Sequence, residues 1–529
     1  MAVGISYKTA SISENWDAIV IGSGMGGLTA AVLLAREGKR RVLVLERHYE
    51  AGGFTHTFRR PGYQWDVGLH YIGQMQDSHS PVRRAFDYVS GGTVQWQPMP
   101  PVYDRILIDG RRFEFTAGEE AFRESLQKSF PSEKAAIDRY LSAVHSSNRW
   151  SVLYSAEKAI PAPLASVFGG VMRAPHLRWA RQTTREVLAG ITSNPELTGV
   201  LTAQWGDYGL PPSQSSFSAH ATIVEHYLNG ASYPIGGSAA IAKTMVPLIE
   251  NAGGSVVTSA EVAGIIVEQN RAAGVRMSDG REFRAPLVMS GVGAANTFER
   301  LLPPDVHELD RLRASLQTLP ASTAHISLYI GLSQTDAALN LTGTNLWVHP
   351  SFDHDANVAR FARDINAPLP GIYISFPSAK DPDFQRRCPG HSTIEAVALL
   401  PWKPFADWAL TKWKRRGEEY ESFKEDLKAR LLAEVERQVP AAMPHIAHAE
   451  LSTPLTTRHF MNYSQGEIYG FAAAPARYLA RDLGARTPVR GLYLTGQDAV
   501  MLGIAGAMFG GIVSASAALG KNLAGAAIK

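Results

Sequence analysis

The feature that most constrains the fold of this chain is a glycine-rich turn between a short apolar strand and a helix. Residues 17–21 are apolar and rich in β-branched side chains, which predicts a buried parallel strand. The turn Gly22-Ser23-Gly24-Met25-Gly26-Gly27 follows at once, and residues 28–37 then place apolar side chains at helical spacing. A second apolar strand, residues 41–45, ends at Glu46. This order predicts a βαβ unit that binds a dinucleotide.

Each part of the turn has a physical task in such a unit. Gly22 permits the tight turn from strand to helix, Gly24 lets the backbone approach a diphosphate, and Gly27 lets helix and strand pack closely. The diphosphate lies at the helix N-terminus, where unpaired N–H groups and the positive end of the dipole face it. Glu46, at the end of the second strand, is placed to accept hydrogen bonds from ribose hydroxyls.

The segment after Glu46 favours FAD over NAD. It runs through Arg47 to Gly52-Gly53-Phe54-Thr55, and the glycine pair can wrap backbone around a bulky flat ligand. An NAD-binding chain normally enters another βαβ unit at this point. We therefore expect an α/β fold: a Rossmann-type, glutathione-reductase-like FAD-binding domain with an inserted α+β substrate domain.

Two later segments are expected to complete the FAD domain. Residues 227–297 contain a helix at 239–251, short strands, and a strand that ends in glycines near Gly291; residues 485–529 contain a strand, the turn Gly496-Gln497-Asp498, and an uncharged helix at 503–519. The predicted FAD-binding domain is thus 1–73, 227–297 and 485–529. The insertions 74–226 and 298–484 are the predicted substrate-binding domain.

Composition limits the other possibilities. The chain has 529 residues, 45% hydrophobic and 19% charged, which fits an ordered protein of two or three domains. A net charge of +3 gives no reason to expect a nucleic-acid partner. The single cysteine, Cys388, excludes an internal disulfide, and the pair His445 and His448 has no third ligand, so no metal site is expected. We expect a cytoplasmic protein, since no signal peptide is evident.

Two segments raise the question of membrane contact. Residues 499–520 carry no charge and include the GxxxG pair Gly506 and Gly510, but Gly, Ala and Ser dominate them, which favours a buried helix beside the cofactor over a membrane span. Residues 150–185 mix apolar side chains with arginines. This second segment is either a peripheral contact with the inner face of a membrane or an amphipathic helix with a solvated basic face. The oligomeric state is not indicated.

Several longer stretches point to a family. The chain resembles the retinol saturase and carotenoid isomerase branch of the phytoene desaturase family, which is FAD-dependent and amine-oxidase-like, over nearly its whole length. The stretches that carry the resemblance are Glu46-Arg47-His48-Tyr49, Gly52-Gly53-Phe54-Thr55-His56-Thr57-Phe58, Asp66-Val67-Gly68-Leu69-His70-Tyr71, Phe217-Ser218-Ala219-His220-Ala221, His226-Tyr227-Leu228-Asn229-Gly230-Ala231, Tyr233-Pro234-Ile235-Gly236-Gly237-Ser238 and Gly491-Leu492-Tyr493-Leu494-Thr495-Gly496-Gln497-Asp498.

The resemblance implies FAD as cofactor and a long apolar polyene or unsaturated lipid as substrate, such as a retinoid, a carotenoid or a fatty-acid-like molecule. It implies chemistry at carbon–carbon double bonds at flavin N5, and it leaves saturation, desaturation and redox-neutral cis–trans isomerisation open. The residues expected to contact the cofactor are Gly22, Ser23, Gly24, Met25, Gly26, Gly27, Glu46, Arg47, Gly52, Gly53, Phe54, Thr55, Val262, Gly291, Gly496, Asp498, Ile504, Ala505 and Gly506.

A saturase also needs a proton donor. The candidates are side chains near the glycine-rich wrap and near the return to the flavin domain, namely His70, Tyr71, His220, His226, Tyr227 and Tyr233. Each of them is alternatively a satisfied core residue. Two other functions share this fold: a flavin amine oxidase, which would want an aromatic cage and a Lys–water pair, and a non-catalytic lipid carrier, which has no need of the intact glycine turn and Glu46.

Overall fold

A six-stranded parallel sheet forms the base of the nucleotide-binding half. The computed structural model describes residues 3–158, 160 and 162–528. The sheet pairs strands from four distant parts of the chain, all parallel. Its order is β1 (Ile5–Ser6), β11 (Ser255–Thr258), β3 (Val42–Leu45), β2 (Ala18–Ile21), β15 (Val288–Ser290) and β21 (Leu492–Leu494). The predicted Rossmann-type α/β fold is confirmed.

Both faces of this sheet are covered, as a parallel sheet requires. On one face lie α1 (Met25–Arg36), α2 (Pro81–Ser90), α10 (Ala239–Glu250), α19 (Gly503–Leu519) and α20 (Leu523–Ala527). On the other lie α11 (Asp310–Gln317) and the antiparallel sheet of β12 (Val262–Glu268), β13 (Arg271–Met277) and β14 (Glu282–Arg284). The strand side chains therefore alternate between two apolar cores, one on each face.

A seven-stranded sheet forms the second half, and it combines strands from both insertions. Its order is β20 (Ile446–Ser452), β16 (Ala324–Leu332), β19 (Ser392–Leu400), β18 (Ile372–Ser375), β17 (Asn345–His349), β8 (Val102–Ile108) and β9 (Arg111–Thr116). Only the β17–β8 pair, where the two insertions meet, is parallel. The first insertion, expected to be largely helical, thus also contributes a hairpin to this sheet.

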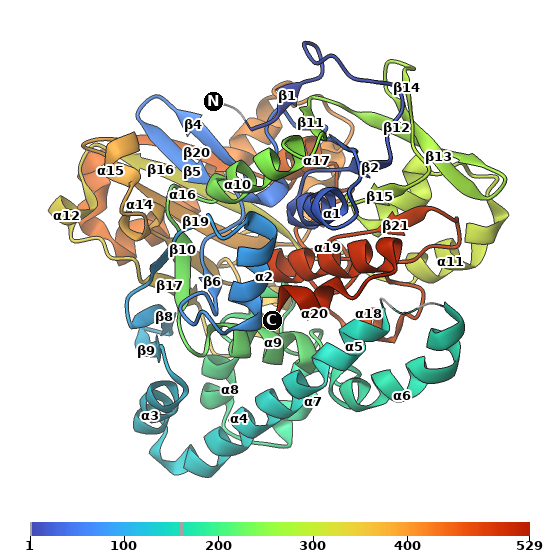
Figure 1. The fold of residues 1–529 in the computed structure, drawn as a ribbon. Coiled ribbons are helices and arrows are strands. Elements are labelled where there is room, and N and C mark those ends of the chain that lie inside the picture. The colour runs from blue at the N-terminus through green and yellow to red at the C-terminus, as the bar shows by residue number, and fades with distance from the viewer. Residues whose placement is uncertain (1–2, 159, 161, 529) are drawn as a thin grey trace.

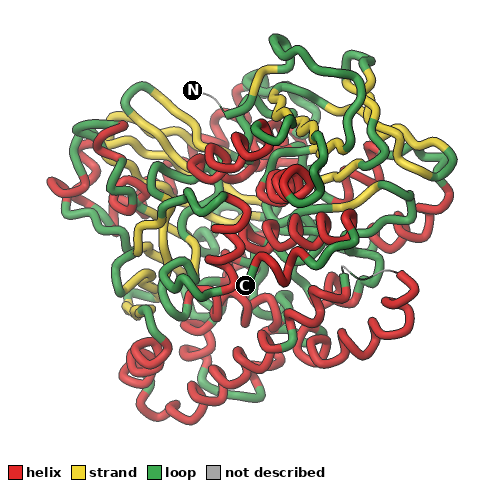
Figure 2. The backbone as a smooth tube through the Cα atoms, in the orientation of Figure 1, coloured by secondary structure: helices red, strands yellow, loops and turns green. Residues whose placement is uncertain are grey.

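Most of the first insertion is helical and gathers in the lower part of Figures 1 and 2. Apart from α2, which packs on the flavin half, its helices are α3 (Glu119–Ser129), α4 (Lys134–Arg149), α5 (Ser151–Glu157), α6 (Ala162–Ala180), α7 (Thr184–Ala189), α8 (Pro195–Leu201) and α9 (Phe217–Tyr227). A small antiparallel sheet of β6 (Ile72–Gly73), β10 (Ala231–Pro234) and β7 (Trp96–Pro98) joins the two ends of this insertion. The helical layer is therefore fixed where it leaves and re-enters the flavin half.

The remaining elements border the large sheet. The hairpin β4 (Thr57–Arg60) and β5 (Tyr63–Asp66) follows the glycine-rich wrap. The long helix of the second insertion is α16 (Glu418–Gln438). The shorter helices are α12 (Asp336–Leu339), α13 (His354–Arg363), α14 (Pro377–Lys380), α15 (Phe384–Arg387), α17 (Pro454–Met461) and α18 (Pro475–Leu479).

The uncharged helix α19 is a packed core helix. A Cβ added at Gly510 would lie 2.2 Å from the Gly496 carbonyl oxygen, and one added at Gly511 would lie 2.6 Å from the Gly26 oxygen of α1. The GxxxG spacing therefore serves the contact between α19, α1 and the turn after β21. Among the described residues, no helix has the length and hydropathy that a membrane span needs.

This contact predicts that Gly511→Ala destabilises the protein. The added methyl group meets backbone and the Cβ of Thr29 at 2.6 Å, so the free energy of unfolding should fall by about 1–3 kcal/mol. Denaturant unfolding measures the change. Gly170→Ala, in α6, is the control, because a Cβ there meets no atom within 4 Å. Equal stability of the two variants would contradict the close packing.

Candidate functional site

One large cavity runs from the N-terminal end of α1 to the seven-stranded sheet. Its volume is about 1090 Å³, at the upper end of the roughly 300–1,000 Å³ of typical ligand pockets. Elements from both halves of the molecule line it, including α1, α5, α9, α19 and several strand ends. Its two ends differ in chemistry: one is built mainly from glycine-rich backbone and the other mainly from aromatic rings.

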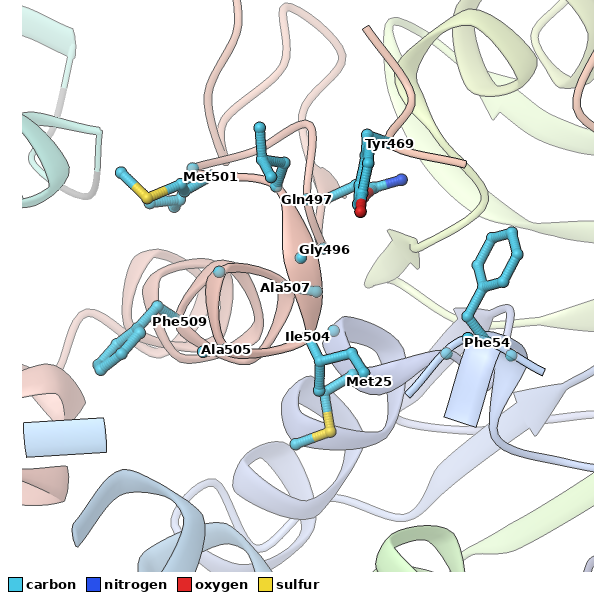
Figure 3. A pocket seen from close by; sticks show the side chains of 18 of the residues that line it. Met25, Phe54, Tyr469, Gly496, Gln497, Met501, Ile504, Ala505, Ala507 and Phe509 are labelled. Atoms are coloured by element: carbon cyan, nitrogen blue, oxygen red, sulfur yellow. The ribbon is translucent and has the colours of Figure 1, made fainter. Parts of the chain in front are cut away.

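The glycine-rich end brings most of the predicted cofactor residues together from three distant segments. The predicted residues that line it are Gly22, Gly24, Met25, Gly26, Glu46, Arg47, Gly52, Gly53, Phe54, Thr55, Val262, Gly291, Gly496, Ile504, Ala505 and Gly506. Figure 3 shows side chains of α1, α19 and the turn at Gly496 around the cavity, Met25 and Ile504 among them. The predicted turn, wrap and C-terminal helix thus border one space.

The backbone of this end leaves room for a diphosphate. A Cβ added at Gly24 or at Gly496 would meet no atom within 4 Å, so both glycines face open space. Gly24 is the N-cap of α1, and the first N–H groups of a helix have no partner within it. Open space in front of a helix N-terminus is the arrangement that binds a dinucleotide diphosphate.

Glu46 lies where a ribose acceptor is expected, and Ser23 holds it there. Oε2 of Glu46 accepts hydrogen bonds from the backbone N–H (2.8 Å) and the hydroxyl (2.7 Å) of Ser23. The Gly52 N–H donates to the same hydroxyl oxygen at 3.0 Å. Ser23 is fully buried and does not line the cavity, so it positions the turn, the acid and the wrap rather than contacting a ligand.

The wrap requires glycine. Gly52 and Gly53 have φ angles of +126° and +56°, in the region that L side chains rarely adopt. Arg47, just before the wrap, forms an ion pair with Glu261 at 3.0 Å and donates to the His459 carbonyl at 2.8 Å. This cross-link brings the residues next to Val262 to the same wall of the cavity.

Three predicted cofactor contacts, Ser23, Gly27 and Asp498, lie outside the cavity lining. The carboxylate of Asp498 accepts hydrogen bonds from the N–H groups of Ala294 (2.9 Å) and Phe471 (3.3 Å), and it is buried outside the cavity lining. It therefore joins three loops, and the sequence pattern could not show that backbone donors already use it. Gly27 also lies outside the lining, since a Cβ there would lie 2.1 Å from the Gly22 oxygen. Gly27 serves helix packing.

We call the other end the aromatic chamber: Tyr71, Trp205, Tyr227, Trp347, Tyr373 and Tyr469, all of which line the cavity. The rings of Tyr71 and Tyr227 are stacked, with centroids 4.3 Å apart and planes 11° apart. The ring centroids of Trp347 and Tyr373 lie 4.8 Å apart. Stacked rings form flat apolar walls, which suit a flat apolar ligand. Trp347, Tyr373 and Tyr469 come from the second insertion, where the sequence offered no signal for them.

Four predicted catalytic residues, His70, Tyr71, His226 and Tyr227, lie in or beside this chamber. His70 lines the cavity, and its Nδ1 lies 2.9 Å from Oε2 of Glu395. Burial lowers the pKa of His70 to about 4, so its imidazole is neutral. His226 also lines the cavity and accepts a hydrogen bond from the Gly73 N–H at 2.9 Å, and burial lowers its pKa to about 4. Neutral imidazoles are weak proton donors, which disfavours both histidines as general acids. The ring of Tyr227 is stacked on that of Tyr71.

Two other predicted catalytic residues lie outside the cavity. His220 is buried on α9, where its ring nitrogens make hydrogen bonds with the hydroxyls of Tyr140 (2.8 Å) and Tyr208 (3.1 Å). The Tyr233 hydroxyl donates to the buried carboxylate of Asp66. Neither residue lines the cavity. Both are satisfied core residues, the alternative that the sequence had left open.

Asp207 is a cavity residue that the sequence reasoning missed. It ends a short 3-10 helix (Trp205–Asp207), and the Tyr71 hydroxyl lies 2.8 Å from its Oδ2. Burial, helped by the nearby charge of Asp104, raises the pKa of Asp207 to about 8. The nearest signal in the sequence is the aromatic residue Trp205, two positions before it. Among the described residues, no group of three or more His, Cys, Asp and Glu could hold a metal ion.

Comparisons with known proteins agree with this site. Residues 25–328 match the model of the flavin containing amine oxidoreductases. The chain is 36% identical to the all-trans-retinol 13,14-reductase of Danio rerio, over 98% of this chain and 88% of that protein. It is 25% identical to prolycopene isomerase 1 of an Oncidium hybrid, over 95% of this chain and 84% of that protein. A putrescine oxidase structure superposes with a TM-score of 0.62 at 15% identity, over 95% of this chain and 98% of that chain, which shows the shared fold. The chain belongs to the flavin containing amine oxidoreductase family.

Proposed function

We propose that this protein is an FAD-dependent reductase that saturates a carbon–carbon double bond of a long apolar polyene. The observation that supports the proposal is the single cavity, which joins the glycine-rich end, where a dinucleotide fits, to the aromatic chamber. A ligand in the chamber shares one continuous space with a cofactor held at Gly24 and Glu46. The walls near the chamber are mostly apolar, which suits a substrate without polar groups along its length.

The relatives support a polyene substrate. A protein named for reducing all-trans-retinol is 36% identical, and one named for isomerising prolycopene is 25% identical. Both names describe chemistry at conjugated double bonds. Saturation is preferred here because the more similar protein is the reductase and because the chamber contains Asp207, an acid that can supply a proton.

The cofactor, when bound, supplies the hydride chemistry of the flavin ring. The protein itself binds and orients the reacting double bond and excludes water from it. The open face of Gly24 and the carboxylate of Glu46 would hold the dinucleotide end. The stacked rings of Tyr71 and Tyr227 would align a conjugated chain and keep water from it.

Neither alternative has the same support. An amine oxidase would place a lysine near the ring, yet among the described residues that line the cavity the lysine is Lys521, which donates to the Glu37 carbonyl at the exposed end of α19. A lipid carrier without cofactor would have no reason to keep space open in front of Gly24 and Gly496.

We further propose that the substrate enters from a lipid surface beside α6. Leu164, Val167, Phe168 and Val171 of α6 are exposed, at the i, i+3, i+4, i+7 spacing of one helix face. Val152 on the adjoining helix α5 is 70% exposed and also lines the cavity. An exposed apolar stripe at a cavity wall fits a shallow contact with a bilayer. The cytoplasmic location stays a prediction.

Gly24→Val should abolish FAD binding. Its side chain enters the open space where the diphosphate is expected, while a Cβ at this position meets no protein atom within 4 Å. The variant should therefore fold normally and purify without flavin absorbance. Absorbance spectra and thermal unfolding measure the two properties. Full flavin occupancy in Gly24→Val would refute the placement of the cofactor.

An anaerobic assay with chemically reduced FAD enzyme and all-trans-retinol tests the proposed reaction. Saturation should oxidise one flavin for each double bond lost, which absorbance and mass spectrometry follow together. Turnover with an unchanged product mass and no flavin oxidation would instead identify an isomerase. In a separate aerobic assay with the oxidised flavin enzyme, oxidation of putrescine without any polyene reaction would favour the amine oxidase.

The double variant Val167→Ser/Val171→Ser should weaken binding to phosphatidylcholine–phosphatidylserine vesicles by about tenfold, because two exposed apolar side chains no longer enter the bilayer. Vesicle co-sedimentation measures the partition. Leu410→Ser is the matched control, since Leu410 is 95% exposed but lies outside the stripe. Unchanged binding of the double variant would exclude this stripe as the membrane contact.

A further inference from the structure

The phenol of Tyr71 lies between two carboxyl groups. Its oxygen is 3.0 Å from Oδ2 of Asp104 and 2.8 Å from Oδ2 of Asp207. A tyrosine hydroxyl has one hydrogen, so it can donate to only one of these oxygens. At the other contact the carboxyl group must carry a hydrogen and donate it to the phenol oxygen. One of the two acids is therefore protonated.

Asp104 is the acceptor of the pair. Its Oδ2 also accepts hydrogen bonds from Gln204 (2.7 Å) and from the Trp347 indole (3.1 Å), and its Oδ1 accepts one from the Asn345 amide (2.8 Å). Lys380 donates to the oxygen of that same amide, so the amine of Lys380 lies behind it. A buried carboxyl group with this many N–H donors is stabilised in its charged form.

Asp207 has no comparable set of donors. Among the described residues, the Tyr71 hydroxyl is the hydrogen-bond partner of its carboxyl group. The side chain is partly buried and borders the cavity, and the charge of Asp104 disfavours a second charge nearby. The geometry therefore assigns the proton to Asp207, which agrees with the rise of its pKa to about 8.

We propose that Asp207 is the general acid of the saturation, and that Tyr71 and Asp104 are positioning residues for it. This inference rests on the proposed function. A bound, reduced flavin would supply a hydride, with its two electrons, to one carbon of the double bond and would become oxidised flavin. Asp207 gives its proton to the other carbon, so the double bond becomes a single bond. Asp207 is then a carboxylate, which water reprotonates between turnovers.

The phenol of Tyr71 can form a hydrogen bond with both the protonated and the ionised form of Asp207. Before the transfer, Asp207 donates to the phenol oxygen while the phenol donates to Asp104. After the transfer, rotation of the hydroxyl turns the same hydrogen toward the new carboxylate of Asp207. The other cavity candidates lack this property, because His70 and His226 are neutral and burial raises the pKa of Tyr227 well above its usual value.

Asp207→Asn tests the acid directly. With reduced FAD and all-trans-retinol, kcat should fall by about 10²–10⁴-fold, the range of general acid catalysis, while KM and flavin occupancy stay near those of the wild type. Glu225→Gln is the control, since Glu225 also lines the cavity but forms an ion pair with His145 at 2.9 Å. Wild-type turnover in Asp207→Asn would overturn the proposal.

Infrared spectroscopy tests the protonation without any turnover. The wild-type protein should show carbonyl stretches of neutral carboxylic acids that disappear near pH 8, and Asp207→Asn should lose the component that belongs to Asp207. Glu395→Gln serves as a control for a second buried acid whose pKa burial raises to about 8. An unchanged spectrum in Asp207→Asn would place the proton elsewhere. A wild type inactive on every polyene would refute the proposed function and leave this result standing.

The pH dependence separates positioning from a merely structural role. An acid must be protonated to act, so kcat should fall as pH rises through about 8. Asp104→Asn removes the charge that raises the pKa of Asp207, so the fall and the infrared change should both move to lower pH. Absence of this shift would refute the role of Asp104. The other groups that face this pair are Tyr71, Tyr103, Tyr208, Tyr227, Tyr373, Tyr469 and, through Asn345, Lys380.

Discussion

The structure depends on the close packing of backbone around the first turn of α1. A Cβ at Gly26 would lie 2.3 Å from the Cα of Gly496, and Gly27 and Gly511 are equally confined by backbone. Because no side chains intervene, the N-terminus of α1, the end of β21 and the start of α19 meet at one point. The open space in front of Gly24 exists because these three segments are held there.

The substrate half is tied to this point by polar contacts through the core. Arg47, just after β3, joins the flavin half to helix α17 at His459, and Asp498 joins three loops. The seven-stranded sheet adds strands of both insertions, so the aromatic chamber is assembled from residues more than two hundred positions apart, such as Tyr71 and Tyr373. A chamber built in this way is a property of the tertiary fold.

Burial then changes the chemistry of the groups at the chamber. Histidines that would titrate near neutrality in water are held neutral, and carboxyl groups divide into those with several N–H donors and those without. Asp104 and Asp207 share one phenol yet differ in charge because only Asp104 has that set of donors. Local sequence does not specify such a difference, since it depends on Gln204 and on Asn345 and Trp347 of β17, more than one hundred positions further along the chain.

The sequence by itself determined the nucleotide-binding unit, because the strand, the glycine turn, the helix and Glu46 are adjacent in the chain and their spacing has one structural solution. It also predicted the bounds of α19 and most cofactor-side residues. Only the tertiary structure decided which acids and histidines reach the cavity. Long-range packing decides the neighbours of each side chain. Buried partners in the core therefore hydrogen-bond to His220, Tyr233 and Asp498, whereas Asp207 lies at the wall of the cavity.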